Sequence, residues 1–313
     1  MRPPCLLALL VCTIVLGGCG SPRPADRAPF SDLDPQPLTD RDRRAEKAVS
    51  EVEAAVAATR ALAPREALAK QQALGPRIAD AAEMALGTRY ANRALFLQAQ
   101  WCFNFRDDGV GVIQALDALN DQEKPALKNS GNALRVQYLL RQEQRREARA
   151  LAERVANSVP EFGFLLGMVA WHERIGGQVT GTAGTTITGE RVQPATGPER
   201  WLLYLHLATW NDQGAFMVER YLAAIAAAGP TVQGDCRLVV VVRDGSLTRL
   251  KADVARMANR EAATILYCRT TAEAQAVVDT WRPPLDGWTV LLDRDRRVSR
   301  VEVRPGDLAP FVQ

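Results

Sequence analysis

The chain has 313 residues, of which 47% are hydrophobic and 24% are charged, and this composition is typical of a folded protein of about two domains. It excludes a largely disordered chain and a protein that spans a membrane beyond its first residues. The formal net charge is +3, and no basic stripe with interleaved aromatic side chains occurs, so the sequence does not indicate nucleic-acid binding.

Residues 1–18 have the pattern of a signal peptide. The run Leu6–Leu16 is apolar apart from Cys12 and Thr13, which is too short to cross a bilayer as a mature helix. Leu16-Gly17-Gly18-Cys19 follows and resembles the lipobox of bacterial lipoprotein signal peptides. That resemblance implies cleavage before Cys19, attachment of lipid to its thiol, and a lasting membrane anchor. The alternative is an ordinary secretory signal with a chance cysteine.

Residues 19–41 are predicted to be a flexible tether. Five prolines stand among serine, aspartate and arginine, with few large apolar side chains: Pro22, Pro24, Pro29, Pro35 and Pro37. In the lipoprotein family, aspartate directly after the lipidated cysteine favours retention in the inner membrane, and here Gly20 and Ser21 follow. We therefore expect a cell-envelope protein anchored in the outer membrane and facing the periplasm, if the source has two membranes.

Residues 42–230 are predicted to form a helical domain, because apolar side chains recur at intervals of three and four. Three helix pairs are expected: Thr88–Phe105 with Val110–Asn120, Asn132–Arg141 with Gln144–Val159, and Glu199–Trp210 with Gly214–Ala228. Pairs of this length favour a solenoid of helical hairpins. The second pair resembles a tetratricopeptide repeat at Leu134, Leu139, Ala148, Ala152 and Pro160. An unrelated helical bundle is the alternative.

A Gly/Thr-rich insertion at residues 176–197 interrupts the helices. Its sequence from Gly176 to Gly189, GGQVTGTAGTTITG, has no following Lys-Ser or Lys-Thr, so it lacks the phosphate-binding pattern of nucleotide-binding loops. Alternating Thr and Val or Ile predict an exposed loop or a hairpin of two short strands.

Residues 234–313 are predicted to form a small α/β domain. We expect strands at Arg237–Val242, Ala263–Tyr267, Trp288–Leu292 and Val298–Val303, with helices at Leu247–Asn259 and Thr271–Trp281. The first two strands should be parallel, and the last two should add an antiparallel hairpin. This order resembles a minimal thioredoxin-like domain. The predicted fold class is therefore α+β multidomain, with a tetratricopeptide-like helical-hairpin domain followed by this α/β domain.

The thioredoxin-like resemblance does not extend to the redox motif. Redox members of the family place Cys-x-x-Cys at the turn after the first strand and a cis-proline just before the third. The turn after Val242 is expected to be Asp244–Leu247, and Gly287 stands before the hairpin strand. Without a thiolate at a helix N-terminus, thiol–disulfide exchange is not expected. Three buried, unpaired thiols are predicted instead: Cys102, Cys236 and Cys268.

No catalytic, cofactor-binding or metal-binding set can be assembled from the remaining candidates. His172 lies in WHERIGG, which lacks the second histidine of a zinc-protease motif, and His206 lies in an apolar segment. Both are interpreted as hydrogen-bonded structural histidines. Two aromatic groups are interpreted as core rather than ligand sites: Trp101, Phe103 and Phe105, and Trp201, Tyr204 and Trp210.

The leading functional hypothesis is a non-enzymatic, lipid-anchored envelope protein. It predicts that the helical repeats bind a protein or peptide partner and that the α/β domain is redox-silent. Two alternatives stay open. One is an envelope thiol-redox protein using Cys236 or Cys268 alone, and the other is a lipoprotein that binds a small ligand through the Gly/Thr-rich insertion.

Overall fold

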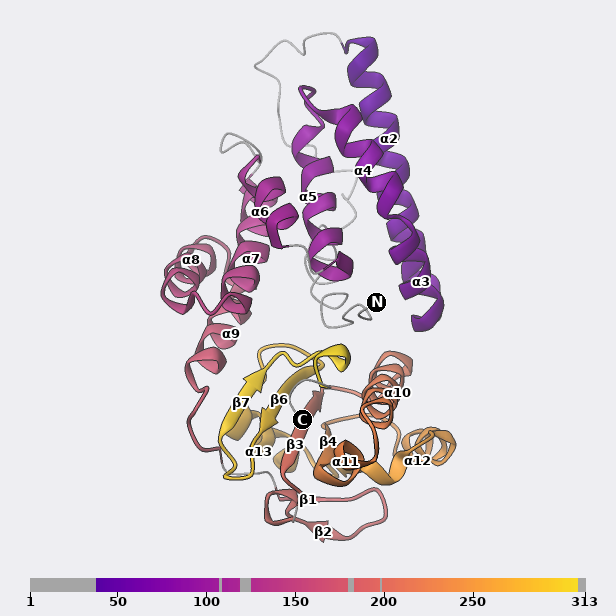
Figure 1. The fold of residues 1–313 in the computed structure, drawn as a ribbon, viewed down its shortest axis with the longest axis vertical. Helices are drawn as coiled ribbons and strands as arrows, with labels where there is room; N and C mark the ends of the chain where they lie inside the picture. Colours follow the sequence, from indigo (N-terminus) through magenta and orange to yellow (C-terminus); the bar gives the residue numbers. More distant parts are fainter. Residues whose placement is uncertain (1–37, 107–108, 119–124, 180–182, 198, 309–313) are drawn as a thin grey trace. The chain divides into compact units, whose positions relative to one another are not determined.

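The computed structural model describes residues 38–106, 109–118, 125–179, 183–197 and 199–308, and it has α+β architecture (Figure 1). The chain divides into two compact units, one that ends at Tyr138 and one that starts at Leu139. The signal peptide, Cys19 and residues 19–37 of the tether lie outside the described residues. Within the described ranges, every helix is too short or too polar to cross a bilayer.

The first unit is helical. It contains α2 (Asp40–Ala58), α3 (Pro64–Ala73), α4 (Gly75–Ala85), α5 (Ala91–Trp101), α6 (Gly109–Asp117) and most of α7 (Pro125–Arg141), with a π-helical turn at Cys102–Arg106. Helix α2 begins two residues before the predicted boundary. Thr39 caps it by accepting a hydrogen bond from the Asp42 backbone N–H (3.0 Å), while the Asp42 carboxylate accepts one from the Thr39 N–H (3.1 Å).

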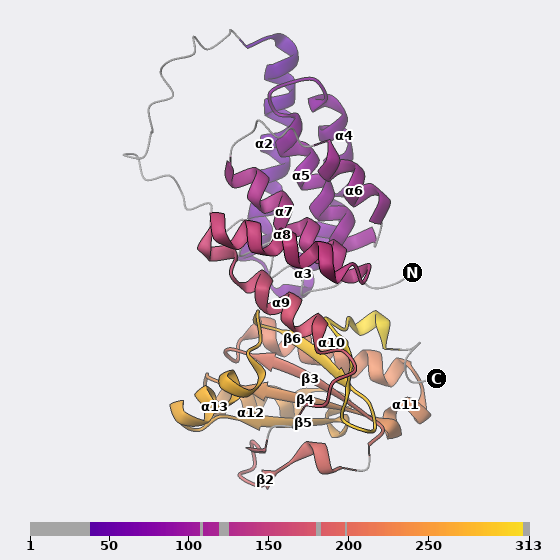
Figure 2. The same ribbon diagram turned by 90° about the vertical axis from the view of Figure 1, so that its left-hand side faces the viewer.

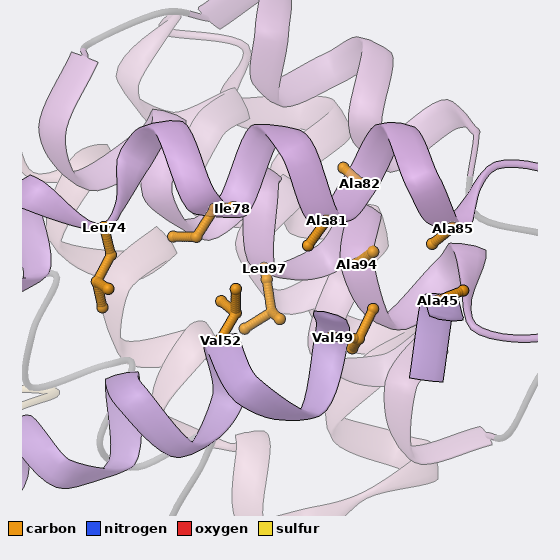
Figure 3. Close-up of a cluster of buried hydrophobic side chains, with 10 residues drawn as sticks. All are labelled: Ala45, Val49, Val52, Leu74, Ile78, Ala81, Ala82, Ala85, Ala94 and Leu97. Carbon is orange, nitrogen blue, oxygen red and sulfur yellow. The ribbon is translucent and has the colours of Figure 1, made fainter. Parts of the chain in front are cut away.

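Small side chains let these helices approach closely. Figure 3 shows Ala45, Val49 and Val52 of α2 facing the buried alanines of α4, with Leu97 of α5 between them. Along the chain α2 packs on α4, α4 on α5 and α5 on α6, which confirms the first predicted helix pair. The assignment to tetratricopeptide repeats stays a prediction, because the observed packing is also that of other helical assemblies.

Gly75 is the tightest point of this unit. A Cβ added there would lie 2.1 Å from Cζ2 of Trp101, whose indole N–H donates to the Gln71 carbonyl (3.1 Å). We expect Gly75→Ala to destabilise the unit by about 1–3 kcal/mol, despite alanine's higher helix propensity, because the anchored indole must move. Chemical denaturation followed by circular dichroism measures this. In a Trp101→Ala background the same change should cost much less, and equal costs in both backgrounds would refute the clash.

The second unit contains a mixed sheet with helices on both faces. Its elements are α8 (Arg145–Ser158), α9 (Phe164–Glu173), β1 (Gly184–Thr185), β2 (Arg191–Val192), β3 (Trp201–Leu207), α10 (Asp212–Ala227), α11 (Pro230–Asp235), β4 (Cys236–Val242), α12 (Leu247–Arg256), β5 (Ala263–Tyr267), α13 (Thr271–Trp281), β6 (Trp288–Leu292) and β7 (Val298–Val301). The strand order is β5-β4-β3-β6-β7. Strands β4 and β5 are parallel, and β6 and β7 form an antiparallel hairpin, as predicted.

The predicted helix Glu199–Trp210 is wrong: this segment contains β3, the central strand of the sheet. It pairs parallel to β4 and antiparallel to β6, and residues 202–207 are all buried. A strand covered on both faces is apolar at nearly every position, so its sequence lacks the alternation that marks a half-buried strand. The predicted boundary between 230 and 234 is therefore wrong too, since the sheet begins at Trp201.

Successive residues of β3 point to opposite faces of the sheet. Leu207 contacts Gly214 of α10, where an added Cβ would lie 3.2 Å from its Cδ1. Tyr204 and His206 face the other way and pack on Trp281 of α13, with ring centroids 4.5 Å and 4.7 Å apart. Helices α10 and α13 therefore cover opposite faces of the sheet (Figure 1).

Candidate functional site

The carboxyl end of β3 leads through a tight turn into α10. Asn211 caps the helix, and its Oδ1 accepts a hydrogen bond from the Gly214 N–H (2.9 Å). Trp210 is buried, its backbone N–H donates to the Asp244 carbonyl (2.9 Å), and its indole N–H donates to Asp253 of α12 (2.9 Å). These bonds hold the turn against the neighbouring β4–α12 connection.

A second loop meets the same end of β3. The Asp286 carboxylate accepts hydrogen bonds from the Ala208 N–H (2.6 Å) and the Gly287 N–H (3.0 Å), and burial raises the pKa of that carboxyl. Gly287 has a φ of +74° and donates its N–H to the His206 carbonyl (2.8 Å). The loop before β6 is thereby tied to the central strand, and no peptide bond within the described ranges is cis.

The structure corrects the position at which a redox motif should be sought. Because β3 is the first strand of the sheet, the turn after the first strand is the one that enters α10, and not Asp244–Leu247. Asn211 and Gly214 stand at the start of that helix, three residues apart, where a Cys-x-x-Cys pair would lie. Sequence reasoning missed these residues. The available signal was Asn211, a favourable N-cap residue directly after a short apolar run.

The cysteines of this unit are poorly placed for thiol chemistry. Cys236 is buried at the start of β4, and burial, with a smaller effect of Asp235, raises its pKa to about 12. Cys268 follows β5, and burial and then Glu273 raise the pKa of its thiol, against a smaller opposing effect of Arg243. Cys102, Cys236 and Cys268 form no disulfide with one another, as predicted, but Cys268 is only half-buried, contrary to the prediction.

The two histidines differ in their surroundings. His172 Nε2 lies 3.3 Å from a carboxylate oxygen of Glu302, with both side chains nearly buried, which confirms a hydrogen-bonded structural histidine. His206 corrects the second interpretation, because it lies in a strand and neither ring nitrogen has a hydrogen-bond partner. Burial, with a smaller contribution from Arg243, lowers the pKa of His206 to about 3. The ring is therefore neutral at physiological pH.

The predicted core role of the aromatic groups agrees with their burial. Trp101 and Phe105 pair at 6.0 Å between ring centroids, and Phe103 is buried. Tyr204 and Trp210 are buried as well, and Trp201 is half-buried. No group of three or more metal-ligating side chains occurs in the described part of the chain.

The Gly/Thr-rich insertion forms the predicted hairpin of two short strands, β1 and β2. The hairpin lies beside edge strand β5, which it contacts through a bridge between Thr186 and Leu266 (Figure 2). A cavity of about 440 Å³ lies between the hairpin, β5 and α13. Its volume falls in the range of small-molecule sites.

Comparisons with solved structures find thioredoxin-like domains. They include a thiol:disulfide interchange protein from a Bacteroides species (TM-score 0.37, 14% identity, covering 44% of this chain and 87% of that one). A thioredoxin-like protein from Bacteroides caccae covers 90% of this chain and 96% of its own, with TM-score 0.39 and 12% identity. A secreted disulfide oxidoreductase from Mycobacterium tuberculosis covers 42% of this chain and 95% of its own, with TM-score 0.33 and 12% identity.

No protein-family model and no curated protein matches the chain. At identities of 10–14% and TM-scores below 0.5, the solved structures say nothing of what this chain does.

Proposed function

We propose that this chain is a lipid-anchored cell-envelope protein that binds partners without catalysing a reaction. In this proposal Cys19 carries the lipid, the tether spaces the folded part from the outer membrane, and the helical region binds an envelope protein or peptide. The thioredoxin-like domain keeps the scaffold of a redox protein without its reaction. The observation that carries the last point is the turn into α10, where Asn211 and Gly214 supply no thiol.

A gain-of-function comparison tests the redox-silent part. The wild-type chain is expected to show no turnover in dithiothreitol-driven reduction of insulin disulfides. The variant Asn211→Cys/Gly214→Cys places two thiols at the N-terminus of α10, where the helix dipole lowers a thiol pKa. A Cβ at Gly214 meets only the end of the Leu207 side chain at 3.2 Å and more distant polar atoms, so the substitution should be accommodated.

The variant should form an intramolecular disulfide on oxidation, which mass spectrometry of the alkylated protein detects. Turnover by the wild-type chain would refute the proposal. A variant that folds but forms no disulfide would refute the assignment of this turn as the position of the missing motif.

The anchor is tested by palmitate labelling in the native host. The wild-type chain and Cys12→Ala should take up label and fractionate with the outer membrane, whereas Cys19→Ala should do neither. Cys12 is the matched control because the proposed cleavage removes it. Label on Cys19→Ala, or an unlabelled wild type, would contradict the anchor.

Pull-down with the full chain from solubilised envelopes should recover a specific partner, and recovery of none would count against the binding role.

A second candidate function is a thiol-redox role for Cys268. It is favoured by the partial exposure of this thiol and by its position two residues before Thr270, the N-cap of α13. The nearby Glu273 and burial oppose it, because both raise the thiol pKa.

Alkylation kinetics at pH 8 decide between the two roles. We expect Cys268 to react more slowly than free cysteine and Cys236 more slowly still, since both thiols ionise less readily than an exposed one. In denaturant, the two should react alike. A native Cys268 that reacts faster than free cysteine would restore the redox candidate.

A further inference from the structure

The cavity beside the β1–β2 hairpin is built by residues from three elements that are far apart in sequence. Gly184 of β1 lines the cavity and packs closely against Leu266 of β5. A Cβ there would lie 3.2 Å from Cδ1 and 3.3 Å from Cβ of Leu266, so a larger residue would need Leu266 to shift by a few tenths of an ångström. The bridge between Thr186 and Leu266 then holds the hairpin at the sheet edge. The hairpin therefore packs against the sheet edge and forms one side of the cavity.

The floor of the cavity is apolar. Val241 of β4 and Leu266 of β5 are direct neighbours in the parallel ladder, and both are buried. Helix α13 provides the opposite wall through Glu273, Ala276, Val277 and Thr280, whose spacing places them on one helix face. Val277 is buried, whereas Ala276 is exposed. The cavity is therefore apolar where its lining residues are buried and polar where they are exposed to solvent.

Two charged side chains line the cavity, Glu273 and Arg191, and they differ in whether they are hydrogen-bonded within the protein. Glu273 is engaged at the start of α13, where one carboxylate oxygen accepts hydrogen bonds from the Arg269 N–H (2.6 Å) and the Thr270 N–H (3.2 Å). Arg191 of β2 is exposed, and its guanidinium makes no hydrogen bond or ion pair to any described residue. Arg191 is therefore the charge that a ligand in this cavity would meet unpaired.

We propose that this cavity binds a small organic acid, with its carboxylate on Arg191 and its apolar body on Val241 and Leu266. A guanidinium presents two parallel N–H groups that match a carboxylate, which favours an acid over a neutral ligand. The volume of about 440 Å³ suits a single small molecule. This inference rests on the proposed non-catalytic role only in treating Cys268, which also lines the cavity, as a wall and not a nucleophile.

Isothermal titration calorimetry on the full chain with 3-phenylpropanoate tests the proposal. We expect 3-phenylpropanoate to bind. Two other compounds should bind at least tenfold more weakly than this acid: 3-phenylpropan-1-amine, which reverses the charge, and propanoate, which lacks the apolar body. Arg191→Gln should weaken binding of the acid at least tenfold, and Arg191→Lys should weaken it less. The matched control Arg294→Gln removes a cation that does not line the cavity and should leave binding unchanged.

A second variant separates the apolar contact from the charge. Ala276→Leu fills the cavity from an exposed helix position and should abolish binding while leaving the melting temperature near that of the wild type. The bound acid should also slow alkylation of Cys268 and leave Cys236 unaffected. Equal binding of acid and amine, an unchanged affinity in Arg191→Gln, or no binding at millimolar acid would each overturn the proposal. None of these results depends on insulin reduction or palmitate labelling, so the two proposals fail separately.

Discussion

Trp281→Ala is expected to lower the free energy of unfolding by about 3–5 kcal/mol, the cost of truncating a fully buried tryptophan in a core that cannot collapse around the gap. Trp281 of α13 is 0% exposed and lies between the sheet and α9. Its ring stacks on Trp171 of α9 (5.7 Å between centroids) and tilts against Tyr204 of β3 (4.5 Å). This single side chain of α13 therefore contacts both α9 and the central strand β3.

Urea unfolding followed by far-ultraviolet circular dichroism measures this loss without relying on the fluorescence of the residue removed. Trp281→Phe is the matched variant, because it keeps an aromatic ring at the same point of α13 and should cost less than half as much. A loss below about 1 kcal/mol in the alanine variant would mean that α13 does not pack on the sheet as described.

Secondary structure was predictable wherever a periodic pattern and a cap occurred together. Helix α13 has the predicted bounds Thr271–Trp281, and its start is marked by the Thr270 and Glu273 capping box. Strand β5 likewise has its predicted bounds, because Ala263–Tyr267 is a short apolar run between turn residues. These elements carry their own local signals, and tertiary packing reinforces the same choice.

Strand β3 was not predictable in this way, because its burial comes from tertiary structure. Trp201–Leu207 continues into Ala208-Thr209-Trp210, and an apolar stretch of that length resembles a buried helix. The sequence contains no Cys-x-x-Cys pair, but the turn at which such a pair would stand was predicted at the wrong position. The cavity was also beyond sequence reasoning, since Arg191, Val241 and Ala276 are brought together only by the fold.

His206 makes the folded chain sensitive to acid. Burial lowers the pKa of this ring from its ordinary value of 6.5 to about 3 in the folded protein. Between these two values the unfolded chain holds a proton that the folded chain excludes, so the free energy of unfolding falls as pH falls. A single such group gives a slope of about 1.4 kcal/mol per pH unit well inside that range. We therefore expect urea midpoints to decrease steadily from pH 6.5 to pH 5.

His206→Leu should remove this slope, because leucine cannot take up the proton. At pH 7.5 the variant should be at least as stable as the wild type, since it also removes two buried ring nitrogens that have no hydrogen-bond partner. The pH range is chosen to lie above most carboxyl titrations. Asp286, whose pKa is raised by burial, gains its proton earlier in the folded state and so contributes with the opposite sign at lower pH.

His172→Gln is the matched histidine control, because it leaves His206 in place and should keep the slope that His206 supplies. An unchanged slope in His206→Leu would mean that the ring is reached by water or by a hydrogen-bond partner in solution. Loss of the slope in His206→Leu but not in His172→Gln would show that His206 is neutral and shielded from water in the folded protein. A protein that retains such a group loses stability in acid without any group at its surface having to titrate.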